Sequence, residues 1–288
     1  MRVLVAGASG LIGREVVKLL KAGGHTVRTL SRDPARAKLL EAEVDEVRVA
    51  DATVEGALAG ICAEIEIVVS ALGAPVSSTA SSKQPFASVD RVANLALLAE
   101  AQRAGVRRFV YVGVFTTPAY ADTAYVRAHT DVETAIRGSG LEHGFVRPTG
   151  VFGALASEFL TMAQKGPLPL IGNGSAVSNP VHERDVADAV LTAVTAPGSV
   201  EIDLGGPDTL TRRKIAELAF TALGKQPRTM AIPVWMMRTA SWLYRLFNRR
   251  MGEFLRFVIL ASIHPCVAPS RGTRSLQAYF EDAARRRA

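Results

Sequence analysis

The stretch RVLVAGASGLIG, residues 2–13, decides the fold. Residues 3–6 form a continuous apolar run, which is typical of a strand buried on both faces of a parallel sheet. Gly7, Gly10 and Gly13 then follow at intervals of three, directly before an apolar spacing typical of a helix. Such glycines allow a tight turn, close approach of the backbone to a pyrophosphate, and close packing of helix on strand. The stretch predicts a phosphate-binding strand–turn–helix unit.

Strand-type and helix-type patterns alternate along the first half of the chain. Apolar runs typical of strands lie at residues 25–30, 45–51, 65–73, 107–114 and 143–148. Helical spacing lies between them, with its longest segments at residues 84–105 and 121–140. This alternation predicts an α/β fold, a Rossmann doubly wound parallel sheet with right-handed crossovers.

The alternation loosens after residue 150. Residues 165–175 are rich in loop-forming residues, and the chain from residue 232 onward has mostly helical spacing. No internal repeat or low-complexity linker separates the two halves. We therefore expect residues 1–150 to form an NAD(P)-binding Rossmann core. Residues 151–288 should form a small, mostly helical substrate region or cap that is interleaved with the core, has no hydrophobic core of its own and does not fold independently.

Composition narrows the class of protein. The 288 residues are 48% hydrophobic and 21% charged, as in globular proteins. The formal net charge of +7 suits an anionic small molecule, a nucleic acid or an acidic membrane surface, although the terminal RRRA reads as a solvated tail. Cys62 and Cys266 match no metal-ligand spacing, which favours a reducing compartment. With no signal peptide and no apolar run long enough to span a bilayer, we expect a cytoplasmic protein that binds a small molecule and no nucleic acid.

Two segments allow alternative interpretations. Residues 234–263 mix aromatic, apolar and arginine side chains, so they could lie on a membrane surface. We favour instead a pair of cap helices that bury Trp235, Trp242 and Phe247 over a substrate pocket, because buried aromatic side chains dominate cores and pockets. The segment HERDVAD, residues 182–188, resembles a metal cluster only superficially. We expect Asp185 to cap the following helix and predict no metal.

The ends of the second and third strands discriminate between cofactors. A carboxylate after the second strand would accept hydrogen bonds from the adenosine ribose of NAD, but this chain has Ser31 and Arg32 there. A guanidinium can bind a 2′-phosphate, so NADP(H) is favoured and NAD(H) stays possible. Alternatively, Arg32 is a solvated surface arginine. Asp51 could accept from the adenine amino group, act as a helix N-cap, or do both.

The motifs occur in the order of a known family. They are GASGLIG at residues 7–13, Asp51–Ala52, SALG at 70–73, VDRVANLALLAEAQRAGVRRFVYVG at 89–113, YVRAH at 125–129, SGLEHGFVRPTGVFG at 139–153 and VHERDVADAV at 181–190. The chain resembles an atypical short-chain dehydrogenase/reductase of the NAD(P)-binding, NmrA-like family over nearly its whole length.

The resemblance implies a Rossmann fold with a dinucleotide site. The residues it implies for that site are Gly7, Ser9, Gly10, Leu11, Ile12, Arg32, Asp51, Ala52, Ala71, Leu72, Gly73, Gly113, His129, Pro148 and Thr149. Asn94 matches an asparagine on the helix before the fifth strand, where it could equally be a packing residue.

The catalytic pattern of the family is altered here. Active relatives pair a tyrosine with a lysine four residues later and place a serine or threonine at the end of the fifth strand. This chain has Tyr125 and His129 on one helix face. It has Gly113 at the strand end, where the nearest hydroxyl groups are those of Thr116 and Thr117. A histidine is fully charged only below about pH 6.5, so it lowers a tyrosine pKa weakly at neutral pH. Tyr125, His129 and Thr116 are the candidate catalytic residues. Alternatively, Tyr125 only packs under the cap.

The sequence therefore predicts an NAD(P)-dependent oxidoreductase, NADPH-preferring, that reduces a carbonyl, enone, imine or quinone by hydride transfer. A non-catalytic NAD(P)-binding redox sensor or assembly factor is the alternative, which the missing lysine and serine favour. An epimerase or isomerase that uses the same cofactor catalytically is the third candidate.

Overall fold

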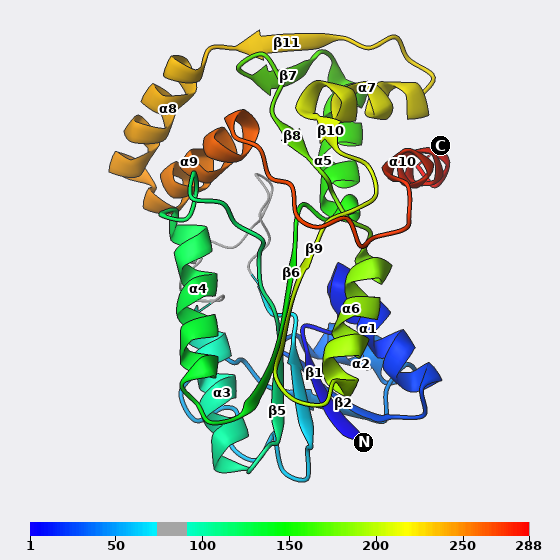
Figure 1. Ribbon diagram of the computed structural model, residues 1–288, viewed down its shortest axis with the longest axis vertical. Helices are drawn as coiled ribbons and strands as arrows, with labels where there is room; N and C mark the ends of the chain where they lie inside the picture. Colours follow the sequence, from blue (N-terminus) through cyan, green and yellow to red (C-terminus); the bar gives the residue numbers. More distant parts are fainter. Residues whose placement is uncertain (74–90, 288) are drawn as a thin grey trace.

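A seven-stranded parallel sheet forms the centre of the computed structural model, which describes residues 1–73 and 91–287 (Figure 1). The strand order is β3-β2-β1-β4-β5-β6-β9. The strands are β1 (Arg2–Ala6), β2 (Thr26–Ser31), β3 (Glu46–Val49), β4 (Ile67–Ser70), β5 (Arg108–Val112), β6 (Glu142–Pro148) and β9 (Val200–Leu204). The order reverses between β1 and β4, as in a Rossmann fold. The predicted doubly wound sheet is confirmed.

Helices cover both faces of the sheet (Figure 1). One face carries α1 (Leu11–Ala22) and α6 (Glu183–Thr195); the other carries α3 (Asn94–Arg103) and α4 (Ala124–Arg137). The short α2 (Pro34–Leu40) connects β2 to β3. Alternate residues of β1 enter different cores: Val3 and Val5 pack with α1 and α6, whereas Leu4 packs with α3 and α4. The continuous apolar run of β1 thus reflects burial on both faces. Residues 84–90 of the long helix expected at 84–105 lie outside the described residues.

The three glycines after β1 allow a tight turn and a close approach of α1 to β1. Gly7 has φ +89°, and a Cβ there would lie 2.6 Å from the carbonyl oxygen of Ala71. A Cβ on Gly13 would overlap the carbonyl oxygen of Gly7, so the closeness of α1 to β1 depends on this glycine. The Gly10 N–H donates to the Gly7 carbonyl at 2.9 Å and closes the turn. The turn delivers the first amides of α1 to the carboxyl edge of the sheet.

The cap is built around α5 (Phe152–Lys165), α7 (Arg212–Ala222) and α10 (Leu276–Arg285). These helices share a separate hydrophobic core, so the expectation that the cap has none is wrong. Its buried members include Phe152, Leu160, Leu168, Leu170, Ile215, Phe220, Leu276 and Phe280. Independent folding of the cap remains an open prediction, because a core is only one requirement for it.

Short strands complete the cap. β7 (Leu168–Ile171) pairs in parallel with β11 (Thr229–Ile232), and β8 (Val177–Ser178) pairs antiparallel with β10 (Leu210–Thr211). β7 lies inside the segment expected to be loop. A proline within a run argues against a central strand. LPLI can pair with β11 despite its proline, because both strands of a two-stranded ribbon are edge strands.

The sheet extends beyond residue 150. Both α6 and β9 come from the second half of the chain, yet β9 pairs with β6 and α6 covers the sheet. The buried Arg108 of β5 donates to the carbonyl oxygens of Ala193 at 3.0 Å and Val194 at 2.8 Å, just at the end of α6. Residues 1–150 therefore hold an incomplete sheet, and the two regions are interleaved.

The helices α8 (Val234–Phe247) and α9 (Arg249–Ile263) form a hairpin beside the top of α4 (Figure 1). The prediction that its aromatic side chains are buried over a pocket is wrong. Trp235 is 70% exposed, Trp242 61% and Phe247 89%. The contacts toward α4 come from α9 instead, whose Phe254 packs against Tyr125.

Within the part of the chain that the structure describes, no helix is both long and apolar enough to cross a membrane.

Candidate functional site

A cavity of about 150 Å³ lies at the carboxyl ends of β4, β5 and β6. This position is next to the reversal in strand order, where doubly wound sheets bind ligands. The cavity is lined by Ile12, Ala71, Leu72, Gly73, Val112, Gly113, Val114, Tyr125, His129, Pro148, Thr149 and Val151. Most of these residues were predicted from the sequence, and they come from five separate elements or strand ends.

The glycine turn lies beside this cavity. Gly7 is in tight contact with the backbone of Ala71, one of the lining residues. Gly10 precedes α1 without a side-chain cap, so the first N–H groups of that helix remain available to a ligand. Ser9 precedes Gly10 in the turn, and Leu11 is the first residue of α1. The two predicted parts of the dinucleotide site, turn and cavity, are thus adjacent.

Arg32 and Asp51 lie farther along the same edge of the sheet. Asp51 Oδ1 accepts from the Thr53 hydroxyl at 2.7 Å and from the Thr53 N–H at 2.9 Å. These two bonds, helped by the charge of Arg32, lower the pKa of Asp51. The residues after Asp51 form turns, so its capping role takes the form of a turn and not a helix N-cap. Arg32 itself is exposed, and Ala52 packs into the core.

Asn94 has a defined structural role. It is fully buried and accepts a 2.5 Å hydrogen bond from the Ser70 hydroxyl, while its amide nitrogen donates to the Leu72 carbonyl at 3.4 Å. α3 thereby fixes the strand end that carries residues 71–73 into the cavity. Similarly, the Thr149 hydroxyl donates to the Asn179 carbonyl at 2.6 Å and fixes the end of β6.

His129 is the most unusual polar residue of the site. It is 5% exposed, and its Nδ1 lies 2.6 Å from the Tyr111 hydroxyl oxygen. Burial lowers its pKa to about 4, so the ring is neutral at neutral pH. Its Nε2 is buried and has no hydrogen-bond partner among the described residues. A buried polar atom without a partner is costly, and one that lines a cavity is available to a ligand.

Tyr125 and His129 are in contact, as their spacing on α4 predicts. Their ring centroids are 4.8 Å apart in an edge-on arrangement, and both side chains line the cavity. Thr116 does not line it; its hydroxyl donates to the Thr117 carbonyl at 3.3 Å. The structure therefore brings two of the three candidate catalytic residues together, and it leaves Thr116 outside the cavity.

A serine in place of Gly113 would meet a steric obstacle. A Cβ at this position would lie 2.8 Å from Glu133 Oε1. That carboxylate is held by Arg147, whose Nη2 is 2.7 Å from Glu133 Oε2. A serine at residue 113 would have to displace this buried ion pair.

Sequence reasoning missed Glu133 and Tyr111. Glu133 continues the four-residue spacing of Tyr125 and His129 on α4, and that spacing could have revealed it. Tyr111 shares a side of β5 with Gly113, two residues on, and alternation along the strand could have pointed to it.

The polar residues at the start of α6 cap the helix and form contacts within the protein. His182, not the expected Asp185, caps the helix by accepting from the Arg184 N–H at 3.0 Å. Asp185 instead pairs with Arg274 and accepts from the Thr273 N–H at 3.1 Å. Among the described residues, no group of three or more His, Cys, Asp or Glu side chains is arranged to hold a metal ion.

Comparison with known proteins assigns the chain to a family. A family model described as NAD(P)H-binding matches residues 7–197. The chain belongs to this NAD(P)H-binding family. In the solved structures, the NADPH-dependent quinone oxidoreductase of Escherichia coli in complex with NADPH has a TM-score of 0.73 at 17% identity, with 97% of this chain and 99% of that chain covered. A nucleoside-diphosphate-sugar epimerase of Staphylococcus aureus has the same fold, with a TM-score of 0.71 at 14% identity and with 98% of this chain and 100% of that chain covered.

Curated relatives in the NAD(P)H-binding family have differing roles. The divinyl chlorophyllide a 8-vinyl-reductase of Oryza sativa subsp. indica is 28% identical over 97% of this chain and 77% of its own length. A photosystem II assembly factor of Guillardia theta is 24% identical over 98% of this chain and 90% of its own length. The NADH dehydrogenase [ubiquinone] 1 alpha subcomplex subunit 9 of Arabidopsis thaliana is 27% identical, and the match spans 60% of that protein.

The residues present fit an NAD(P)H dinucleotide. The turn at Gly7 and Gly10 offers backbone N–H groups to the phosphates. His129 lines the cavity, and its Nε2 has no hydrogen-bond partner among the described residues. Gly73 and Gly113 also line the cavity.

Proposed function

We propose that the protein is an NADPH-dependent reductase of a small, activated organic substrate. The observation that supports this best is the juxtaposition of Tyr125 with the buried, unpartnered Nε2 of His129 in one cavity beside the glycine turn. The rice relative is named as a reductase, which supports the same reaction class.

Each residue has a proposed task. Gly7, Gly10 and the start of α1 bind the diphosphate, and Asn94 holds residues 71–73 in place. His129 Nε2 hydrogen-bonds a hydroxyl of the nicotinamide ribose. Bound NADPH supplies the hydride. Tyr125 donates a proton to the substrate atom that gains negative charge.

The neutral state of His129 restricts the substrate. A lysine at this position would lower the tyrosine pKa by its charge, but a histidine with a pKa of about 4 carries no charge at neutral pH. The Tyr125 phenol then receives no help from a positive charge at residue 129. Quinones, enones and imines with strong electron withdrawal need little proton assistance, so they are the proposed substrate class.

Substitution of Tyr125 tests the reaction. Tyr125→Phe removes only the phenol oxygen, so we expect NADPH affinity to stay unchanged. Turnover should fall by about 10²-fold, the lower end of the range for general acid catalysis, because the proposed substrates need little proton assistance. Turnover is measured as NADPH consumption with a panel of quinones, enones, imines and carbonyls. Thr116→Val is the matched hydroxyl deletion, and we expect it to preserve turnover because Thr116 lies outside the cavity. Full activity of Tyr125→Phe on the best substrate would rule out the phenol as the acid.

Arg32 carries the proposed preference for NADPH. Its guanidinium is exposed at the end of β2, near Asp51, where a 2′-phosphate could be bound. A charged hydrogen bond of about 1.5–3 kcal/mol corresponds to roughly a 10–100-fold loss of NADPH affinity in Arg32→Ala, with NADH affinity unchanged. Calorimetric titration of both cofactors measures this. Arg36→Ala removes a nearby exposed charge and is the control. Equal affinities of the wild-type protein for NADPH and NADH would contradict the proposal.

A non-catalytic NAD(P)-binding protein is the second candidate. Gly113 and the neutral His129 favour it, because the sequence resemblance implies a serine or threonine and a lysine at these two positions in active relatives. The Guillardia theta relative is named as an assembly factor. NADPH binding without NADPH consumption across the whole substrate panel would support this candidate over the reductase.

A further inference from the structure

The hairpin α8–α9 presents an apolar surface to solvent. We call it the α8 face, and it consists of Trp235, Met236, Trp242, Leu243, Leu246 and Phe247, all of them exposed. Helical spacing places these residues along one side of α8. Burial stabilises large apolar side chains, so six of them exposed along one side of a helix indicate an interaction surface.

The outward orientation of this face is determined by the packing of the hairpin. On the opposite side of α8, the buried Ser241 donates to the Gly252 carbonyl at 2.8 Å. A Cβ on Gly252 would lie 2.8 Å from the Arg245 backbone nitrogen, so the two helices are in close backbone contact there. Rotation of α8 to bury its tryptophans would break this contact. The apolar face is therefore exposed as a consequence of how the hairpin is built.

Positive charge accompanies the α8 face. Residues 234–263 hold five arginines and one glutamate, a formal net charge of +4 within a chain of +7. Glu253 is shared, at 3.3 Å from Arg245 Nε and 4.0 Å from Arg256 Nη1. Arg238 has no ion-pair partner among the described residues. The hairpin thus has more cationic side chains than its own acidic group can neutralise.

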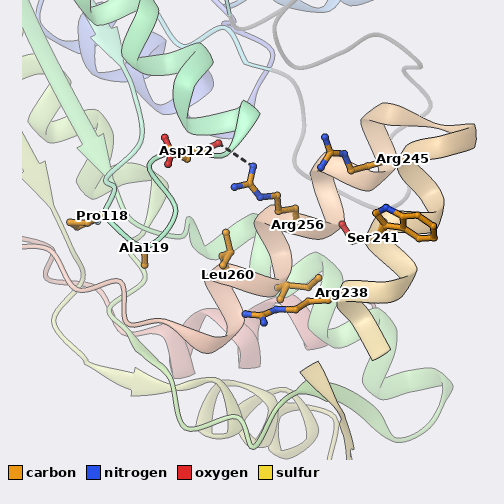
Figure 2. Close-up of a pocket in the computed structure, with 10 residues that line it drawn as sticks. Pro118, Ala119, Asp122, Arg238, Ser241, Arg245, Arg256 and Leu260 are labelled. Carbon is orange, nitrogen blue, oxygen red and sulfur yellow. Dashed lines mark hydrogen bonds between the residues drawn. The ribbon is translucent and has the colours of Figure 1, made fainter. Parts of the chain in front are cut away.

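Three of these arginines line a second cavity. It has a volume of about 370 Å³ and lies between the hairpin and the segment Pro118–Asp122. Figure 2 shows Arg238, Arg245 and Arg256 extending from α8 and α9 toward that segment, with Arg256 donating to the Asp122 carbonyl at 3.2 Å. Trp242 and Ser241 also line this cavity. The cavity that adjoins the apolar face is thus lined by three arginines and one acidic residue, Asp122.

We propose that the α8 face docks onto an anionic lipid bilayer. α8 lies along the membrane surface, its tryptophan and phenylalanine side chains enter the interfacial layer, and the arginines contact lipid phosphates. Amphipathic surface helices bind membranes with this combination of aromatic and basic residues. Each arginine near an anionic surface adds to the strength of binding.

The charge argues against a second copy of the chain as the occupant. A two-fold interface would bring the same surface of each copy together, and hence two hairpins of net charge +4. An anionic bilayer complements both the apolar and the cationic parts. The proposal is independent of whether the protein turns over a substrate.

The two tryptophans of the chain make the test specific, because both are in α8. The full-length protein is mixed with vesicles of phosphatidylcholine alone, or of phosphatidylcholine with phosphatidylglycerol. We expect co-sedimentation and a blue shift of tryptophan fluorescence only with the anionic vesicles, and weaker binding as salt is added. Quenching by brominated lipid should place the tryptophans at the interface.

Variants identify the surface. Phe247→Gln with Leu246→Gln keeps both tryptophans as reporters and should weaken binding by tenfold or more; Arg238→Gln with Arg249→Gln should weaken it by on the order of tenfold. Leu39→Gln and Arg285→Gln remove an exposed leucine and an exposed arginine elsewhere and should leave binding unchanged. The absence of binding to anionic vesicles, equal binding to both vesicle types, or binding unaffected by the α8 variants would each overturn the proposal. Concentration-dependent dimerisation that the α8 variants abolish, without vesicle binding, would assign the face to a second copy.

Discussion

At the scale of single residues, His129 shows how burial changes the chemistry of a position. Its ring is enclosed among Tyr111, Tyr125 and the end of β5, so the charged form is disfavoured and the pKa falls to about 4. A lysine here would need compensation for a buried charge in the free protein. In the neutral ring, Nδ1 lies 2.6 Å from the Tyr111 hydroxyl oxygen, and Nε2 is buried without a hydrogen-bond partner among the described residues.

This burial predicts a pH dependence of stability. The unfolded chain protonates His129 near pH 6.5, whereas the folded protein protonates it only near pH 4. Between these values the unfolded state binds more protons, so the free energy of unfolding falls as the pH decreases; at pH 5 the loss is about 2 kcal/mol. Urea unfolding at pH 7 and pH 5 should show this loss in the wild-type protein and a smaller one in His129→Gln. Equal losses in both proteins would show that His129 titrates normally.

At the scale of elements, two carboxylates in the first turn of α6 form hydrogen bonds that connect the sheet to the cap. Glu183 accepts from the Gly153 N–H at 2.6 Å and from the Tyr279 hydroxyl at 3.2 Å, which joins α6 to α5 and α10. Asp185, nearly buried, holds the segment that enters α10 through Thr273 and Arg274. Both carboxylates also lie at the positive end of the α6 dipole.

Asp185→Asn should therefore destabilise the protein. The change removes a charge that accepts backbone N–H groups and pairs with Arg274, and we expect a loss of about 1–3 kcal/mol in the free energy of unfolding. Asp188→Asn is a matched control, since Asp188 is 51% exposed and lies 3.4 Å from the same arginine. Its effect should be below about 0.5 kcal/mol. Urea unfolding of both variants measures the difference, and comparable losses would contradict the role given to Asp185.

At the scale of the whole molecule, the Rossmann sheet depends on the second half of the chain. A fragment of residues 1–150 lacks β9 and α6, so β6 becomes an open edge and one face of the sheet keeps α1 but loses α6. Arg108 would also lose the carbonyl groups of Ala193 and Val194. We expect this fragment to show no cooperative thermal unfolding and no NADPH binding. A soluble fragment that unfolds cooperatively and binds NADPH as tightly as the full chain would contradict this expectation.

Features that depend on a few neighbouring residues could be predicted from the sequence, and features that depend on contacts between distant residues could not. The glycine turn and the strand ends are local patterns, and parallel strands bring their carboxyl ends to one edge, so residues 71–73, Tyr125, His129, Pro148 and Thr149 were expected together. The direction of the α8 face depended on a contact between Ser241 and Gly252, and the cap core on helices far apart in the chain. Sequence patterns that extend over a few residues do not reveal contacts between distant segments.

The sequence by itself determined the doubly wound sheet, the phosphate turn and the four-residue spacing of Tyr125 and His129, because periodicity and glycine sterics act over a few residues. Only the tertiary structure decided that His129 is neutral and that the Glu133–Arg147 pair lies against Gly113. It also decided that Trp235 and Trp242 face outward. Burial, desolvation and the orientation of a helix are set by the neighbours that the fold assembles around a residue, and those neighbours come from distant parts of the chain.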